Sequence, residues 1–557
     1  MAASFSLIDD PWIACVRTDG AQELLSLRQV FDAAPEGEPA VAGLRGDSPA
    51  QDYAVLRVLL AIFWRAHSAE VRRGQAGPYK HRKWFQGAWE AARSGEADAA
   101  VLRHLEDHRA RFDLLHPETP FMQVADLHTE KDSRLETRRI VPEAEDEYFT
   151  MRAGEPRGSL SFAEAARWVI YTQAYDYSGI KSGAVGDPRV KGGKGYPIGT
   201  GWTGSTGGTV IVGSTLRGTL VLNTTRDCLV NEPDVDRAVW EREPDTAAQR
   251  KPEAAAVYPT GPADLATWQS RRVRLFHDGE RVTEVLVSNG DRIPDAGANI
   301  MDDPMTPYRY SANKSKGEHA VYYPRPFDAN RTMWRSLEPL IAVEGDPGFT
   351  EKNKASKRPR NLTQLAVLRN YEMVPEWANI RMVSVAYGPQ SSSVAEAVTS
   401  AIEIPVSLLS EEARRQRRLV LDNAQATAVA ARALGSFAGQ LAAAGGGEYE
   451  FQSAPTDTLL SRLELPFSRW LKGLEEGNPE EHAAEWQRYV RRRVLAEADV
   501  LLNGVGPQAL IGREKPPVSE NGRPYIESAG TVLRRLRKNL NDALPAAVRE
   551  KDEGKEG

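Results

Sequence analysis

The sequence predicts an α+β protein with a large mixed N-terminal domain that contains long loops, followed by a C-terminal four-helix bundle. Three observations lead to this fold class. The 557 residues, of which 41% are hydrophobic and 27% charged, can supply cores for more than one domain of ordinary size. Up to residue 404, helical periodicity and short β-branched runs are mixed with polar, proline-rich connections. From Pro405 onward, long amphipathic stretches with short breaks replace this mixture.

The expected elements of the mixed domain follow in chain order. Residues 5–31 predict a hairpin and a short helix, because turn residues separate two apolar runs. Residues 51–67 are rich in helix formers and nearly apolar all round, which is typical of a buried helix. Helical periodicity continues over 86–113 until a His-Pro pair ends it. Residues 209–223 alternate like two strand segments, and 224–400 mix strand-like runs with long polar connections.

The C-terminal part is expected to form an up-down bundle, because short connections join its long helices. The tail after Val548 is charged and lacks core-forming residues, so we expect it to be disordered. The predicted helices cover 408–444, 456–475, 479–503 and 528–545, and the predicted domains are 1–404, 405–547 and the tail 548–557.

Charge and cysteine content exclude several classes of protein. With 71 basic and 77 acidic residues the formal net charge is −6, so a nucleic-acid role would need local basic patches. Cys15 and Cys228 are the only cysteines, too few for a disulfide scaffold or a four-cysteine zinc module. The start carries Asp9 and Asp10 instead of a signal-peptide pattern, and no run of 18 apolar residues occurs. We therefore expect a soluble, cytoplasmic protein without contact to a membrane.

The segment 179–208 is unusual because eleven of its thirty residues are glycine, with lysines and arginines between them. Residues 199–204 match GxGxxG by letter, but a proline precedes the motif and a β-branched run follows it, which is the wrong context for a dinucleotide site. A P-loop is excluded because Gly195 stands where Ser or Thr would bind Mg²⁺. Bare backbone N–H groups beside cations suit a phosphate chain or a groove of duplex nucleic acid, while a flexible solvated loop explains the same composition.

No catalytic residue, metal ligand or cofactor site can be nominated. The sequence contains no GxSxG or HExxH motif, and its carboxylates are unpatterned. His104 and His108 are four residues apart, but no third ligand is indicated and charged neighbours favour a solvated helix face. An enzyme that uses segment 179–208 and Lys194 for a nucleotide or phosphorylated substrate is the alternative function.

Basic residues gather into blocks, as a surface that follows a nucleic-acid strand requires, although a solvated face is the ordinary explanation of such runs. One block lies in the polar segment 351–360, and three more lie at 414–418, 491–493 and 534–538. The residues predicted to contact the DNA backbone are Lys352, Lys354, Lys357, Arg358, Arg534 and Arg535.

Several segments together resemble the large, CasA-type subunit of Cascade, the type I-E CRISPR surveillance complex. The segments FSLIDDPWIACVRTDG (5–20), LSLRQVF (25–31) and HPETPFMQV (116–124) are similar to that family, as is the order of glycine-rich loop, mixed domain and C-terminal helices. The resemblance covers essentially the whole chain. It implies a non-catalytic subunit that inspects duplex DNA for the motif beside the target, promotes strand separation, steadies the displaced strand and recruits a helicase–nuclease. The implied partners are a guide-RNA-bearing backbone and small subunits, while guide pairing reads the target sequence.

The resemblance also implies site residues. Gly179 and Gly183 match a glycine loop that enters the minor groove, with Gly195 or Gly199 as alternative counterparts. Gln390, in YGPQSSS (387–393), matches a glutamine wedge that starts unpairing, although an ordinary surface turn explains the same residues.

Two further assignments follow from the same resemblance. Arg292 stands where the family has a lysine finger, with Lys314 and Lys316 as rival candidates, and arginine keeps the charge without the geometry. Phe149 would lie in a loop that touches the guide RNA and neighbouring DNA, where an aromatic ring can stack on a base. No metal is implied, because the cysteine cluster of some relatives is absent.

Overall fold

The computed structural model divides into a mixed unit and a helical unit. It describes residues 3–73, 80–142, 158–230, 235–294, 301, 303–316, 319–328, 334, 337–350, 352, 354–370, 373–474, 478–515 and 524–548. The mixed unit comprises Met1–Ala329 and Glu351–Ala401, and the helical unit comprises Asn330–Thr350 and Ile402–Gly557. The prediction of an α+β protein with a helical C-terminal region is confirmed, whereas the four-helix-bundle topology stays a prediction. Phe149 and residues 549–557, which include most of the expected tail, lie outside the described residues.

The mixed unit combines many short elements with one long buried helix. Its helices are α1 (Leu27–Phe31), α2 (Pro49–Arg73), α3 (His81–Ser94), α4 (Ala99–Asp107), α6 (Phe162–Tyr175), α7 (Trp202–Thr206), α8 (Leu216–Leu222), α9 (Arg226–Val230), α10 (Pro262–Ala266) and α12 (Arg360–Arg369). Its strands are β1 (Ile13–Arg17), β2 (Gln22–Leu25), β3 (Val41–Leu44), β4 (Leu135–Glu136), β5 (Lys181–Ser182), β6 (Lys194–Gly195), β7 (Gly208–Val212), β8 (Arg271–His277), β9 (Val282–Asn289), β10 (Tyr308–Tyr310), β11 (Tyr322–Pro324) and β12 (Trp377–Tyr387). The strand β13 (Val394–Pro405) begins in the mixed unit, and its last residues, from Ile402 on, are assigned to the helical unit.

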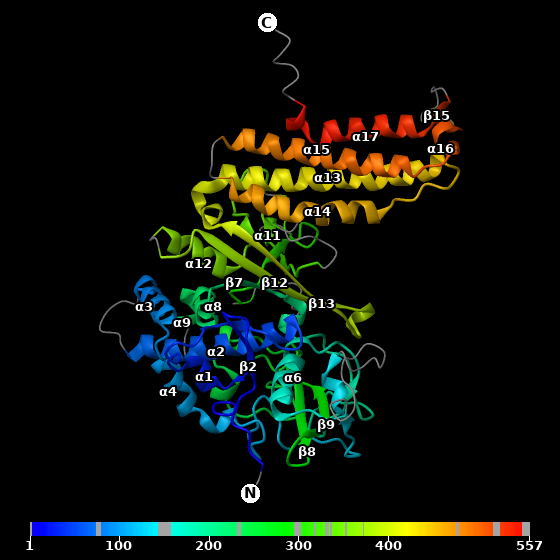
Figure 1. Cartoon of the computed structure of the whole chain (residues 1–557). Coiled ribbons are helices and arrows are strands. Elements are labelled where there is room, and N and C mark those ends of the chain that lie inside the picture. The colour runs from blue at the N-terminus through cyan, green and yellow to red at the C-terminus, as the bar shows by residue number, and fades with distance from the viewer. Residues whose placement is uncertain are drawn as a thin grey trace. The chain divides into compact units, whose positions relative to one another are not determined.

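The strands of the mixed unit form small sheets instead of one large one. Within the described residues, three sheets have three strands each, in the orders β2-β1-β3, β4-β9-β8 and β13-β12-β7, and β5-β6 and β10-β11 are two-stranded. The strand pairs with a described register are antiparallel. The strands β12 and β13 form the long hairpin visible in Figure 1, and its connecting turn contains Gln390.

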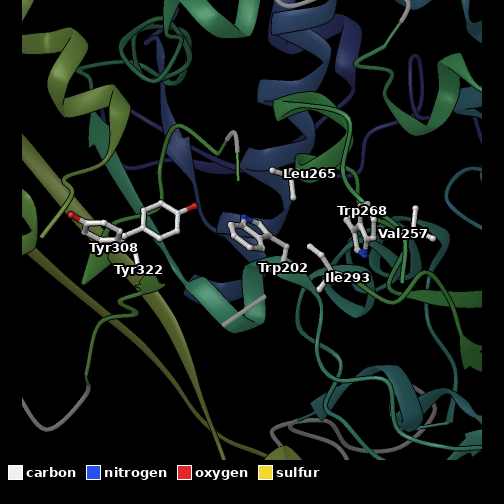
Figure 2. Close-up of a cluster of buried hydrophobic side chains, with 7 residues drawn as sticks. All are labelled: Trp202, Val257, Leu265, Trp268, Ile293, Tyr308 and Tyr322. Atoms are coloured by element: carbon white, nitrogen blue, oxygen red, sulfur yellow. The ribbon is translucent and has the colours of Figure 1, made fainter. Parts of the chain in front are cut away.

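The core of the mixed unit is built around α2. Residues 53–66 of this helix are all buried, which confirms the interpretation of an apolar segment as a buried helix. The guanidinium of Arg57 is buried in this helix and pairs with Asp303 at 2.9 Å, so the charge is compensated. A second apolar cluster consists of Trp202, Val257, Leu265, Trp268, Ile293, Tyr308 and Tyr322. In Figure 2, Trp202 lies between the two tyrosines and Trp268, so the end of the glycine-rich segment belongs to the core.

Two expectations about the mixed unit require correction. Residues 209–223 contain one strand, β7, followed by the helix α8, and not two strands. The Thr215 hydroxyl caps α8 by accepting a hydrogen bond from the N–H of Gly218, a local signal that outweighs the alternating pattern. Residues 86–113 do not form one continuous helix. They contain the end of α3 and the separate helix α4, because Gly95 ends α3 in a left-handed conformation. The predicted hairpin and helix over 5–31 are confirmed as β1, β2 and α1.

The described part of the helical unit consists mainly of four long helices. They are α13 (Arg414–Ala444), α14 (Ser453–Lys472), α15 (Pro479–Asn503) and α17 (Ala529–Ala543), and they run alongside one another in Figure 1. Each lies close to its predicted range, and α13 contacts the other three. The sequence did not predict the short elements α11 (Glu338–Ile341), α16 (Pro507–Ile511), β14 (Arg513–Lys515) and β15 (Tyr525–Glu527).

Residues 330–350 belong to the helical unit although the sequence placed them in the mixed domain. The contact that explains this is an ion pair between Asp346 and Arg417 of α13 at 2.7 Å, with both side chains buried. Trp334 adds a stacked contact to Phe467 of α14, with ring centroids 4.9 Å apart.

Among the described helices of both units, none is long and apolar enough to cross a membrane.

Candidate nucleic-acid interface

The glycine-rich segment is anchored to the body of the mixed unit at two places, just before Gly179 and at Gly199. The Arg271 guanidinium donates hydrogen bonds from Nη2 to the carbonyl oxygens of Tyr177 (2.9 Å) and Gly199 (3.0 Å). Arg271 is itself buried on β8. One side chain from a rigid sheet therefore fixes the start and the end of a long excursion of the chain.

Charged groups are buried beneath this segment. The Asp176 carboxylate pairs with Arg271, with Arg139 at 2.8 Å and with Lys181 at 3.3 Å. Burial alone would raise the pKa of the Asp176 carboxyl, but the three cations hold it well below its usual range. Burial lowers the pKa of Lys181 to about 7, although Asp176 acts in the opposite direction. These charges stabilise the base of the segment and are not available to a ligand.

The predicted loop glycines occupy different environments. Gly183 is buried, and a Cβ there would lie 2.5 Å from the carbonyl carbon of Gly193, so the two backbones need this glycine to approach each other. Gly195 is likewise buried against the Asn289 side chain. Gly179 is half-buried, and Gly199 has a positive φ of 92° with open space around its Cβ position. The contacts thus give Gly183 and Gly195 packing roles and leave Gly179 nearer the surface.

The tip of the segment carries two free cations. Lys191 and Lys194 exchange backbone hydrogen bonds of 3.1 and 3.2 Å around Gly192 (φ 59°) and Gly193 (φ 73°), the arrangement of a two-residue hairpin turn that needs positive φ at both central positions. Both lysine side chains are exposed, and neither makes an ion pair or side-chain hydrogen bond within the described residues. Sequence composition named these lysines but gave no reason to prefer them.

Two exposed apolar side chains accompany these lysines. Lys181 pairs with Gly195 across β5 and β6, so Ile180 and Tyr196 extend the same register by one position. Ile180 is 58% exposed and Tyr196 53% exposed, and the carbonyl of Tyr196 accepts a 2.6 Å hydrogen bond from Asn289 Nδ2. Sequence reasoning missed this pair because the register of such short strands leaves no pattern in the sequence.

The turn that carries Gln390 is tight and strained. The N–H of Ser391 donates to the carbonyl of Gly388 at 2.9 Å, with Pro389 and Gln390 as the central residues. Gln390 has φ 56° and ψ 20°, and Ser391 has φ 53°, in the left-handed region that non-glycine residues rarely adopt. Gln390 is exposed, so the turn projects a strained, amide-bearing residue away from the hairpin.

The glycine-rich segment and the Gln390 turn lie next to each other. The N–H of Ser178 donates a 2.7 Å hydrogen bond to the carbonyl of Ser391, which joins the residue before Gly179 to the residue after Gln390. The Tyr387 hydroxyl donates to the Tyr175 carbonyl at 2.9 Å, a second link between the same two segments. We call Gly179, Ile180, Lys191, Lys194, Tyr196 and Gln390 the loop–turn surface.

The finger candidates are not placed in contact with this surface by any described interaction. Arg292 is exposed, and its carbonyl accepts a hydrogen bond from the N–H of Val257. It follows β9 by three residues, and Asn289 at the end of β9 contacts the glycine-rich segment. Lys314 and Lys316 are exposed in the connection between β10 and β11.

The predicted backbone-contacting residues differ in their availability. Lys352 is exposed, whereas Lys354 and Arg358 are half-buried, and Arg358 donates a hydrogen bond to Thr363 at 3.1 Å. The Lys357 ammonium lies 4.7 Å from the centre of the Tyr322 ring. In the helical unit, Arg534 is exposed, and Arg535 is half-buried and pairs with Glu527 at 3.2 Å. The two groups belong to different units.

The nucleotide-binding alternative finds no support in the glycine geometry. The Cβ position of Gly201 lies 2.6 Å and 2.9 Å from the carbonyl oxygens of Gln173 and Ala174. Carbonyl oxygens repel phosphate, and Gly204 packs against the Tyr387 hydroxyl, so the residues that spell GxGxxG serve helix and strand packing. The described residues contain no group of three His, Cys, Asp or Glu side chains placed to hold a metal, and His104 Nε2 accepts a hydrogen bond from Trp240.

Comparison with known proteins gives a consistent result. The sequence model of a family described as CRISPR-associated protein Cse1 matches residues 6–496. A CRISPR-associated protein CasA/Cse1 of Thermus thermophilus is 26% identical over 345 residues, and the match spans 61% of each protein. The crystal structure of Thermobifida fusca Cse1 has a TM-score of 0.82 and 36% identity, and the match covers 98% of this chain and 99% of that one.

A chain in a structure described as a CRISPR RNA-guided surveillance complex shares the fold, with a TM-score of 0.66 and 20% identity over 97% of this chain and 99% of that one. The family match covers most of the chain, and its location agrees with the segments that carried the resemblance. The protein therefore belongs to the CRISPR-associated Cse1 (CasA) family of large subunits.

Proposed function

We propose that this chain is the non-catalytic subunit of an RNA-guided surveillance complex that recognises the motif beside the target in duplex DNA. In this proposal the loop–turn surface approaches the minor groove, Gln390 starts strand separation, and the complex supplies the guide RNA, the backbone subunits and the small subunits. The same subunit steadies the displaced strand and recruits a helicase–nuclease. Membership of the Cse1 family and the likeness to a chain of an RNA-guided surveillance complex support this assignment.

The observation that carries the proposal is the hydrogen bond from Ser178 to Ser391, because it fixes Gly179 and Gln390 side by side. A surface that reads a groove and opens the adjoining base pair needs both functions within one or two base-pair steps. The exposed lysines Lys191 and Lys194 supply positive charge for the phosphates, and Ile180 and Tyr196 supply the apolar contact that minor-groove proteins often insert between base steps.

The remaining predicted residues complete the proposal. Arg292, or one of its rivals Lys314 and Lys316, would contribute the basic finger, and Phe149 would contact the guide RNA. The backbone contacts would come from the exposed Lys352 and Arg534 ahead of Lys357, Arg358 and Arg535, whose side chains already have partners in the protein.

The groove can be identified by editing single functional groups of the DNA. Inosine in place of guanine removes the 2-amino group of the minor groove and one Watson–Crick hydrogen bond with it, whereas 7-deazaguanine alters only the major groove and keeps the pairing. We expect inosine at a motif position to lower the affinity of the assembled complex for duplex DNA, the opposite of what easier strand separation would do, with 7-deazaguanine as the control that leaves it unchanged. The opposite pattern would assign recognition to the major groove and contradict the proposal.

A further inference from the structure

The helical unit contains a groove between α14 and α15 that the site described above does not use. Its volume is about 580 Å³, within the size range of small-molecule sites. The lining side chains recur every three or four residues along both helices, so one face of each helix forms one wall. They are Pro466, Arg469 and Trp470 from α14, and Glu485, Trp486, Arg488, Tyr489 and Arg492 from α15.

Aromatic rings form a fixed floor. The centroids of Trp470 and Trp486 are 5.7 Å apart, and Trp486 stacks on Tyr489 at 5.7 Å with an interplanar angle of 28°. The indole N–H of Trp470 donates to the His482 carbonyl at 3.0 Å, and that of Trp486 donates to Thr427 Oγ1 at 2.9 Å. Because both N–H groups are satisfied inside the unit, the indoles are held in place, and the half-buried Tyr489 is the outermost ring of the stack.

Cations surround this floor. Arg469 and Arg492 are exposed, and within the described part of the chain neither guanidinium has an ion pair or a hydrogen bond. Arg488 is half-buried in the same wall, and Glu485 is the one acid among the lining residues. Even without Arg488, the two exposed guanidinium groups of Arg469 and Arg492 outnumber the one carboxylate, so the groove has a net positive charge and favours an anion.

We propose that this groove binds a nucleotide of a single-stranded nucleic acid, with the base against Tyr489 and the flanking phosphates between Arg469 and Arg492. Every base has a π-face that can stack on an aromatic ring, and arginine contacts phosphate through a planar, charge-assisted fork. In a duplex the bases stack on each other, so a duplex presents phosphates to the arginines but no base to the ring. The inference rests on the proposed function only for the source of the strand, either displaced DNA or guide RNA.

The test uses the full-length chain and a fluorescently labelled single-stranded DNA of about 15 nucleotides, a length that spans typical single-strand sites. Fluorescence anisotropy over a range of salt concentrations gives the affinity and its salt slope. We expect Tyr489→Ala to weaken binding by about tenfold, because stacking on one ring is lost. The matched variant Tyr489→Phe keeps the ring and should bind like the unmodified chain.

The arginines are tested in the same assay. Arg492→Gln should lower the salt slope by about 0.7, the value for one phosphate contact on a single strand. Arg432→Gln removes an exposed arginine of α13 outside the groove and should leave the slope unchanged. An RNA strand of the same sequence, measured in parallel, identifies the source, since tighter binding of DNA indicates the displaced strand and tighter binding of RNA indicates the guide.

Equal affinities for Tyr489→Ala and the unmodified chain would overturn the proposal. A duplex that binds as tightly as the single strand would also overturn it. So would equal displacement of the strand from Tyr489→Ala and Tyr489→Phe by the polyanion poly-glutamate. Each result would mean that the groove is a basic face on which no base stacks. These results would leave the proposed function intact, because motif-dependent capture of duplex DNA by the assembled complex is measured separately. Only failure of the unmodified chain to support that capture would count against the proposed function.

Discussion

Replacing Gln390 should affect folding and DNA opening in opposite directions. Gln390 has φ 56° and ψ 20°, and a non-glycine residue in this left-handed region costs about 1–2 kcal/mol. Glycine avoids this cost but loses about 0.5–1 kcal/mol more conformational entropy on folding. Gln390→Gly should therefore raise the free energy of unfolding of the mixed unit by about 0.5–1 kcal/mol, measured by urea unfolding.

The same substitution should impair strand separation, because glycine has no side-chain amide. It cannot replace the hydrogen bonds that a base loses when it is separated from its partner. One to two hydrogen bonds are worth about 1–2 kcal/mol, so we expect roughly a tenfold loss of opening. The assay is the fluorescence of 2-aminopurine beside the motif, which rises when the base unstacks in the assembled complex. Gln390→Ala is the matched control for strain, since it removes the amide but keeps the β-carbon, and it should reduce opening without the gain in stability.

Unchanged opening in both variants would refute the wedge assignment and leave Gln390 as an ordinary surface residue of the turn. A lower free energy of unfolding for Gln390→Gly would refute the strain argument. The two results are independent, because the first depends on the side chain and the second on the backbone.

Three further perturbations test the charges of the two units. Burial lowers the pKa of Lys181 to about 7, well below its ordinary value of 10.5, so above pH 7 the unfolded chain binds a proton that the folded chain does not. The free energy of unfolding should therefore rise between about pH 7 and 8, below the range in which the buried thiols of Cys15 and Cys228, whose pKa burial raises to about 12, act in the opposite direction. Lys181→Met should remove this rise in urea titrations. Replacing Lys191 and Lys194 together by Gln should lower the salt slope of duplex binding by the assembled complex by about 1.8 if each contacts one phosphate, and an unchanged slope would remove them from the interface. Arg417→Met leaves the buried Asp346 carboxylate without its partner, so it should lower the free energy of unfolding of the helical unit by about 3–5 kcal/mol in chemical unfolding. The double variant Arg417→Met/Asp346→Leu should recover most of this loss. An unchanged free energy of unfolding in the single variant would contradict the buried pair.

Local sequence patterns predicted the features that depend on neighbouring residues. The helix α2 was predicted because its composition is apolar all round, and the long C-terminal helices were predicted because their periodicity and breaks are local. Pro389 marked the turn in which Gln390 lies, since proline fixes its own φ and favours the second position of a turn.

The sequence could not assign the glycines of 179–208, because their roles depend on distant residues. Gly204 is required by Tyr387, and Gly201 by the end of α6, and neither contact leaves a local signal. The same reason hid the membership of residues 330–350 in the helical unit, which depends on Asp346 meeting Arg417. The exposed pair Ile180 and Tyr196 was missed because two-residue strands carry no detectable register.

The measurement that tests the central claim most directly is duplex binding by the guide-loaded complex, assembled with and without this chain. Matched targets with and without the flanking motif are compared at one fixed salt concentration, because such affinities depend steeply on salt. We predict that omission of the chain abolishes the difference between the two targets. Unchanged motif dependence without the chain, or failure of the chain to join the complex, would contradict its assignment as the recognition subunit.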